Sequence, residues 1–107
     1  MEKTIKFNGT DLRLKASLFT IIDYRNVFGT ELFNDIKKLD NIKDENQSLL
    51  IDILFRIIYI LNRPFSNKSY EDFLKEIDFN FLTNTDELIN LSNAITELLG
   101  GSNDNPK

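Results

Sequence analysis

The fold is decided by the sequence YRNVFGTELFND, residues 24–35, in which one helix ends at Gly29 and a second begins at once. Upstream of this glycine, apolar residues recur at steps of three and four, the spacing of one face of a helix that Ser17 can cap. These residues are Leu18, Ile21, Tyr24 and Phe28. Glycine takes the left-handed conformation without a steric penalty, which suits a helix end. The sequence therefore predicts two helices that meet at a sharp corner.

The helix after the corner is predicted from its start and its apolar side. Thr30 is a favoured capping residue, and Glu31 in the first turn suits the positive end of the helix dipole. The predicted apolar side consists of Leu32, Phe33 and Ile36.

Arg25 lies on the side of an otherwise apolar helix, next to Tyr24. We expect its guanidinium to donate to Asp35 or to a backbone carbonyl at the corner, because a planar guanidinium can fix the angle between two helices. The alternative is a partner-facing anchor, since arginine and tyrosine are enriched at interfaces.

The first segment of the chain alternates apolar and polar residues, which is typical of strands with one buried face. Asn8-Gly9 is a strong signal for a tight hairpin turn. The apolar positions on its two sides are Ile5, Phe7, Leu12 and Leu14. We expect this hairpin to pack on a helix, because two strands alone are only marginally stable.

The longest apolar run covers residues 49–61 and is interrupted only by Asp52 and Arg56. These two residues lie one helical turn apart, so they can pair on the single wet stripe of a core helix. A bilayer crossing needs roughly 20 apolar residues, so the run is too short for a membrane span. Pro64 should close the helix, because its ring disfavours helical geometry at the preceding residue.

Two further helices are predicted. Ser69 caps the first, and its apolar face consists of Tyr70, Phe73, Leu74 and Ile77. A bulky connector over residues 79–82 leads to the second, which starts near Asn84 or Thr85 and stops at Gly100-Gly101. Its predicted buried residues are Leu88, Leu91, Ile95, Leu98 and Leu99.

The predicted fold is mainly α, an N-terminal β-hairpin followed by a compact bundle of about five helices. Residues 1–101 should form a single domain, since the 107-residue chain leaves no room for a second. Residues 39–46 are polar and are predicted as a loop. Residues 102–107 have no apolar side chain to anchor them and are predicted to be disordered.

Composition excludes most catalytic chemistry. The chain contains no histidine and no cysteine, which removes Ser-His-Asp and Cys-His arrangements, disulfides and thiolate metal ligands. The segment over residues 40–45 is oxygen-rich but lacks the residue types of a calcium loop. We interpret the carboxylates of the first half as solvated helix faces rather than an acid–base pair; these are Asp23, Glu31, Asp35 and Asp40. The prediction is no enzyme, no cofactor and no metal.

Charge and the N-terminus limit the partners. A net charge of −4 argues against a partner held by phosphate contacts, so no nucleic acid is expected. The first residues contain no apolar run of the length of a signal peptide, which predicts that the protein stays where it is made, with no membrane partner.

The corner and its surroundings resemble the N-terminal signature of tail assembly chaperones of long-tailed phages and prophages of Gram-positive bacteria. The matching positions are Lys15, Ala16, Ser17, Tyr24, Arg25, Phe28, Gly29, Glu31, Leu32 and Asp35. The resemblance continues through the aromatic central helix at residues 56–60 and the segment 69–74, where Phe73 stands in place of the tryptophan that family members often carry. It covers roughly residues 4 to 80.

This resemblance implies a protein that binds the tape measure protein, keeps it soluble and helps the tail tube protein polymerise around it. It also implies a longer, frameshifted form of the same chain as a possible partner, a location in the cytoplasm of the infected host, and absence from the mature virion. Tyr24, Arg25, Phe28, Gly29 and Asp35 are the motif or partner-binding residues that it suggests. Two alternatives stay open: a small acidic helical adaptor or inhibitor of one folded protein, and a structural subunit of the tail.

Overall fold

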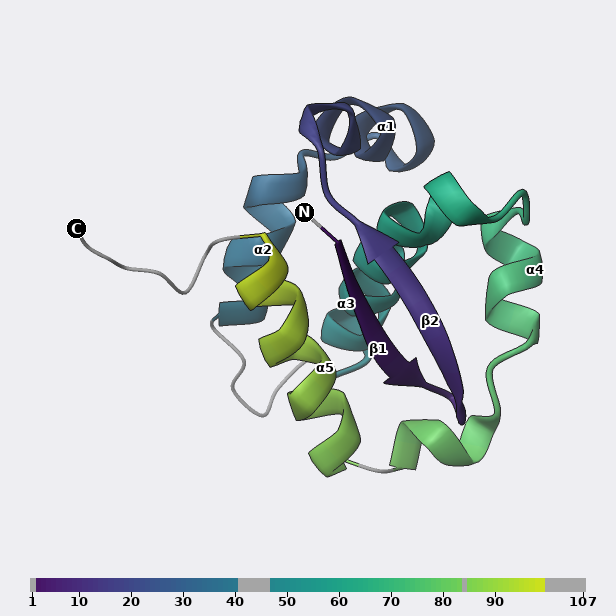
Figure 1. Ribbon diagram of the computed structural model, residues 1–107. Coiled ribbons are helices and arrows are strands. Elements are labelled where there is room, and N and C mark those ends of the chain that lie inside the picture. The colour runs from purple at the N-terminus through teal and green to yellow at the C-terminus, as the bar shows by residue number, and fades with distance from the viewer. Residues whose placement is uncertain (1, 41–46, 84, 100–107) are drawn as a thin grey trace.

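The computed structural model describes residues 2–40, 47–83 and 85–99 and has the predicted mainly helical architecture with an N-terminal hairpin (Figure 1). The strands are β1 (Glu2–Phe7) and β2 (Thr10–Lys15). The α-helices are α1 (Leu18–Phe28), α2 (Leu32–Asp40), α3 (Gln47–Asn62), α4 (Tyr70–Lys75) and α5 (Thr85–Leu98). Short 3-10 helices, η1 (Arg63–Phe65) and η2 (Phe79–Thr83), follow α3 and precede α5. The residues of the predicted tail and most of the predicted loop lie outside the described part; α2 itself extends to Asp40.

The hairpin forms as its turn signal predicts. β1 and β2 are antiparallel, and both turn residues have positive φ, 54° at Asn8 and 86° at Gly9. The Asn8 side chain also donates to the carbonyl of Glu76 at 2.9 Å and accepts the backbone N–H of Asp78 at 3.2 Å. The turn is thereby attached to the segment that follows α4.

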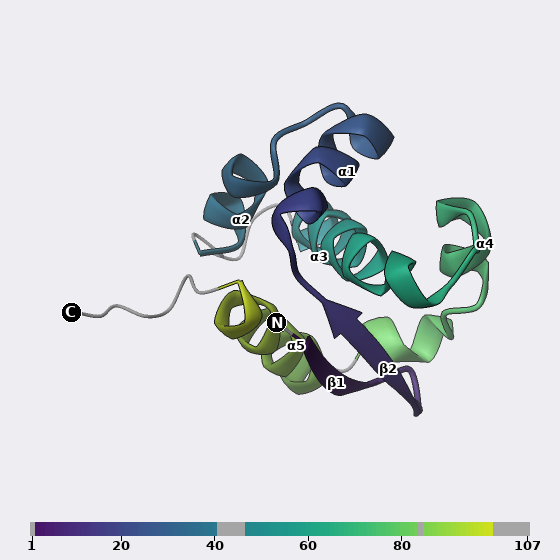
Figure 2. The ribbon, with the colours of Figure 1, turned by 45° about the horizontal axis from the view of Figure 1, so that its top comes forward.

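The helix α3 is the centre of the molecule, as the apolar run predicts. Figure 2 shows it with α1, α4 and the hairpin arranged around it. Its side chains from Ile53 to Leu61 are buried except for Arg56, which pairs with Asp52 at 3.0 Å. The helix ends at Asn62, and Pro64 lies in the 3-10 turn that follows. Within the described residues, none of the helices combines the length and the apolar character that a bilayer crossing requires.

A cluster of phenylalanines joins the hairpin to the helical part. The ring of Phe7 in β1 lies 5.8 Å from Phe55 of α3, 5.7 Å from Phe73 of α4 and 5.2 Å from Phe81 of η2, measured between centroids. Edge-to-face and stacked ring pairs of this kind add stabilisation beyond the burial of apolar area. This cluster fixes the positions of α4 and η2 relative to α3.

The predicted apolar face of α1 is partly wrong. Leu18 is 79% exposed, whereas Thr20 and Asp23 are buried together with Tyr24. Asp23 accepts from Arg63 of η1 at 2.8 Å, and the Thr20 hydroxyl accepts the backbone N–H of Ser17, the predicted N-cap, at 2.8 Å. These polar contacts turn the helix so that its first apolar residues face outward.

The predicted start and apolar side of α2 also need correction. The carbonyl of Glu31 accepts the first helical hydrogen bond, from Asp35 at 3.1 Å, so the helix starts one residue later than a Thr30 cap would place it. Thr30 instead donates its hydroxyl to the Asp35 carboxylate at 2.9 Å. Leu32 and Ile36 are buried as predicted, but Phe33 is exposed.

Candidate functional site

The signature residues meet at the corner between α1 and α2, where they build a buried polar cluster. Tyr24 is completely buried, and its hydroxyl donates to Asp35 Oδ2 at 2.6 Å. The same oxygen accepts the Thr30 hydroxyl, and Asp35 itself is only 3% exposed. A buried carboxylate is tolerated when such donors satisfy it.

The surroundings of the Tyr24 phenol keep it protonated, so its hydroxyl remains a hydrogen-bond donor. Burial, and secondarily the hydrogen bond to Asp35, raise the pKa of Tyr24 far above that of an ordinary phenol. The phenol is therefore protonated at any physiological pH. The cluster is suited to holding two helices at a fixed angle, not to proton transfer.

Gly29 and Arg25 complete the corner. Gly29 has φ 76°, and its N–H donates to the carbonyl of Arg25 at 2.8 Å, so the predicted left-handed helix end is confirmed. Arg25 makes the expected intramolecular tie, but its acceptor is Glu31 rather than Asp35 or a carbonyl, with contacts of 2.9 and 3.3 Å. This pair is exposed, so it contributes little stability.

Phe28 connects the corner to the central helices. Its ring lies 4.9 Å from that of Tyr70 and 6.2 Å from that of Tyr59, and the Arg56 guanidinium lies 5.2 Å from its centroid. Among the five suggested motif residues, Tyr24 and Asp35 are thus covered in this conformation, and Arg25 is the charged residue that remains accessible.

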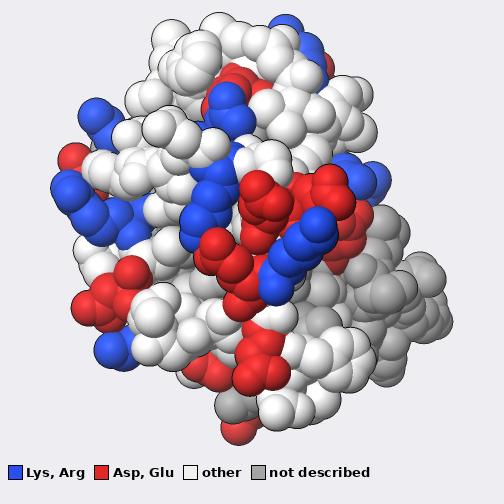
Figure 3. Space-filling view, turned by 90° about the vertical axis from the view of Figure 1, so that its right-hand side faces the viewer, with Lys and Arg blue, Asp and Glu red and all other residues white. Residues whose placement is uncertain are grey.

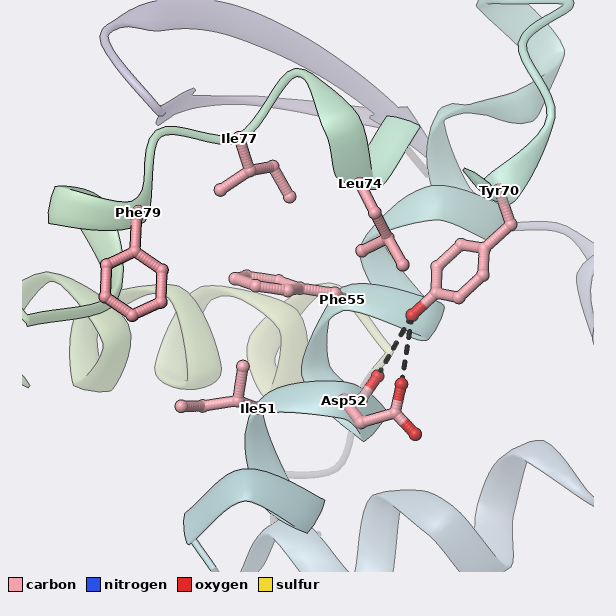
Figure 4. A pocket seen from close by; sticks show the side chains of 7 residues that line it. All are labelled: Ile51, Asp52, Phe55, Tyr70, Leu74, Ile77 and Phe79. Atoms are coloured by element: carbon pink, nitrogen blue, oxygen red, sulfur yellow. Dashed lines mark hydrogen bonds between the residues drawn. The ribbon is translucent and has the colours of Figure 1, made fainter. Parts of the chain in front are cut away.

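A second candidate site is apolar, in contrast to the polar cluster at the corner. It is a groove of about 330 Å³ between α3, α4 and η2 (Figure 4). It is lined by Ile51, Asp52, Phe55, Tyr70, Leu74, Ile77 and Phe79. Phe55 is buried at its base, whereas Leu74 is 38% exposed and Phe79 is 76% exposed. Bulky side chains left open to solvent around a groove are typical of a binding surface.

One end of the groove is polar, and its side chains are held by a hydrogen bond and an ion pair. The Tyr70 hydroxyl donates to the Asp52 carboxylate at 3.2 Å, and Asp52 also accepts from Arg56 (Figure 4 shows the tyrosine contacts). Burial, followed by the nearby charge of Asp52, raises the pKa of the Tyr70 phenol. Tyr70 is therefore a fixed donor at the end of an otherwise apolar groove.

The local sequence explains why Phe79 is left outside the core. Ser69 caps α4 as predicted, accepting the N–H of Asp72 at 3.1 Å, but the helix ends at Lys75, so Ile77 lies beyond it. The Asp78 carboxylate then accepts the N–H of Asn80 at 3.0 Å, which fixes the turn into η2. Of the two phenylalanines in this turn, Phe81 enters the core and Phe79 does not.

The groove itself is not predicted from the sequence, although most of its lining residues belong to the apolar segments predicted above. Tyr70, Leu74 and Ile77 belong, with Phe73, to the predicted apolar face of one helix, and Phe79 belongs to the predicted bulky connector. The available signal was the two-residue separation of Phe79 and Phe81, because residues two apart in a helical turn of about three residues point in different directions.

Uncovered apolar side chains also lie on α1, where Leu18, Phe19 and Ile22 are exposed. In Figure 3 the top of the molecule, where α1 lies, is largely uncharged apart from a few acidic and basic side chains. Within the described ranges, no group of three or more acidic residues is placed to hold a metal ion.

No protein-family model, curated protein or solved structure matches this chain significantly.

Proposed function

We propose that this protein is a phage tail assembly chaperone that binds the tape measure protein transiently, keeps it soluble and promotes assembly of the tail tube around it. The observation that carries the proposal is the apolar groove with its exposed rim residues Leu74 and Phe79. The signature residues support it as the scaffold of the domain. On this proposal the protein has no catalytic role and acts in the cytoplasm of the infected host.

The proposed role follows from the tendency of an uncovered amphipathic helix to aggregate. A tape measure protein of the expected kind is long, helical and amphipathic, so its apolar stripe aggregates until the tube encloses it. A groove between helices can receive side chains of such a stripe in the helix-in-groove mode. A groove of about 330 Å³ receives only a few side chains, so on this proposal each contact is weak and reversible. Many copies along one tape measure would give protection together with easy release.

The two alternative functions differ in the fate of the chain. A structural subunit stays in the finished tail at a fixed stoichiometry, and an adaptor or inhibitor binds one folded partner once. A chaperone leaves when the tube arrives. Composition of purified tails therefore separates the subunit from the chaperone.

Co-expression with a tape measure protein tests the proposal; on this proposal its gene is expected to lie beside that of this chain. The tape measure protein should be soluble with the wild-type chain and insoluble without it. The double variant Leu74→Ser, Phe79→Ser should lose this effect, because it removes the exposed apolar rim. Phe33→Ser with Ile89→Ser is the matched control, since it also replaces two exposed apolar residues but on α2 and α5.

Two results would contradict the proposal. If the tape measure protein stayed insoluble at every ratio, the chaperone function would be wrong. If both double variants solubilised it equally well, the groove would not be the binding site, and Leu18→Ser with Phe19→Ser would test the exposed surface of α1 in the same assay.

A further inference from the structure

At each end of the apolar groove, a lining residue is a carboxylate or has one next to it in the chain. Asp52 lines one end together with Tyr70, and Glu71 is the next residue along α4. At the other end, Asp78 lies between the lining residues Ile77 and Phe79. Figure 3 shows acidic side chains gathered across the middle of the side of the molecule on which α4 lies, with fewer basic ones among them.

Asp52 is paired with Arg56 at 3.0 Å, so the charge that is left near the groove comes from the neighbouring carboxylates, which are incompletely neutralised. Glu71 pairs with Lys75 at 3.4 Å, but both side chains are more than two-thirds exposed, so water and salt screen the pair. Glu76 pairs with Lys68. Among the described residues, Asp78 makes no ion pair; its side chain accepts only the N–H of Asn80.

This distribution determines which helix fits. An amphipathic helix that seats an apolar residue in the groove brings the residues one turn before and one turn after it towards the two ends. Lysine or arginine at those positions would meet carboxylates, whereas glutamate or aspartate would be repelled. The charges would thus select among helices that share the same apolar stripe.

We propose that the groove between α3, α4 and η2 binds amphipathic helical segments in which lysine or arginine flanks a bulky apolar residue, and that Glu71 and Asp78 provide this selectivity. The proposal rests on the proposed function, because it names the partner segments that the chaperone groove would take. It concerns charge selectivity, which the apolar groove alone does not provide.

Two synthetic peptides test the selectivity directly. Both are helical peptides of about 20 residues with the same leucine and phenylalanine stripe, long enough to be helical in water. One carries lysine one turn before and after the central phenylalanine, and the other carries glutamate there. Fluorescence anisotropy with the full chain should show the lysine peptide binding at least about tenfold tighter at low salt, with a ratio that falls as salt is added.

A charge-matched pair of variants locates the effect. Glu71→Gln with Asp78→Asn should lower the preference for the lysine peptide to less than about threefold. Glu2→Gln with Glu97→Gln removes the same charge from exposed residues of β1 and α5 and should keep the wild-type preference. Circular dichroism melts check that both proteins are folded.

The outcomes separate the inference from the proposed function. Equal binding of the two peptides, or equal loss of preference in both double variants, overturns the charge selectivity but leaves an apolar chaperone groove possible. Absence of binding by either peptide in a chain that still solubilises the tape measure protein also overturns it, because the partner then binds elsewhere. Failure of the Leu74→Ser, Phe79→Ser variant to weaken the lysine peptide would overturn the choice of groove.

Discussion

The corner between α1 and α2 and the groove between α3, α4 and η2 use their side chains in opposite ways. At the corner, polar groups are buried and satisfied: Tyr24 and Thr30 both donate to Asp35. At the groove, apolar groups are exposed, above all Phe79. The corner therefore stabilises the fold, and the groove leaves apolar area available for a partner. The recognisable motif of this chain marks its scaffold, and the surface proposed to bind carries no motif.

The difference has an energetic basis. A buried hydrogen bond to a charged group contributes about 1.5–3 kcal/mol, and removing one partner leaves the other unsatisfied. An exposed apolar side chain contributes little to folding. Substitutions at the two regions should therefore separate stability from binding.

Among the polar groups, the largest expected loss of stability is at the carboxylate of the corner. Asp35→Ala should lower the free energy of unfolding by about 3 kcal/mol, because it leaves the buried Tyr24 hydroxyl without its acceptor and opens a small cavity. Asp35→Asn keeps an acceptor oxygen and should cost less. Urea unfolding measures both, and a loss below about 0.5 kcal/mol for Asp35→Ala would show that the cluster does not hold the corner.

Alkaline pH should weaken the fold through two phenols, the buried Tyr24 and the partly buried Tyr70. The pKa values of Tyr24 and Tyr70 are raised in the folded state, so the folded protein retains protons that the unfolded chain releases from about pH 10. The stabilisation is complete below that pH and is lost as pH rises above it, by up to about 1.4 kcal/mol per pH unit for each tyrosine. Tyr24→Phe and Tyr70→Phe should each remove about half of the slope in urea titrations at increasing pH; an unchanged slope would contradict the burial argument.

The glycine of the corner should have a smaller effect. Gly29→Ala is expected to cost about 1 kcal/mol or more, because φ is 76° there. An added Cβ would meet no atom within 4 Å, so the cost is conformational and not steric crowding by neighbours. Gly29→Asn, which tolerates left-handed backbone better, should cost less. If the wild type, Gly29→Ala and Gly29→Asn had the same melting temperature, the backbone at residue 29 would not be strained.

Much of the fold follows from local sequence. The Asn8-Gly9 turn, the left-handed Gly29 and the Asp52–Arg56 stripe of α3 are as predicted, because turn chemistry and helical periodicity act over a few residues. The orientation of α1 does not follow from periodicity. It depends on Asp23 meeting Arg63, a contact 40 positions away in the sequence.

The groove was less accessible to prediction for a related reason. The sequence shows two bulky residues, Phe79 and Phe81, but it does not show which of them is buried. The packing of Phe81 against Phe7 decides this. The Asp78 cap that fixes the turn is a single side-chain contact with no repeating pattern. A surface assembled from three elements in this way is visible only after they are packed.

The smallest expected change in stability is at Phe79, and it gives the sharpest contrast with the corner. Phe79→Ala should change the free energy of unfolding by less than about 0.5 kcal/mol, because the ring is 76% exposed. Phe81→Ala, two residues along the same turn, should cost about 3 kcal/mol or more, because its ring is buried against Phe7 and Phe55. Urea unfolding gives these values, and anisotropy with the lysine-flanked peptide should show weaker binding for Phe79→Ala. If Phe79→Ala unfolded the protein as readily as Phe81→Ala, the exposed ring would be part of the core, and the distinction between scaffold and binding surface would fail at this position.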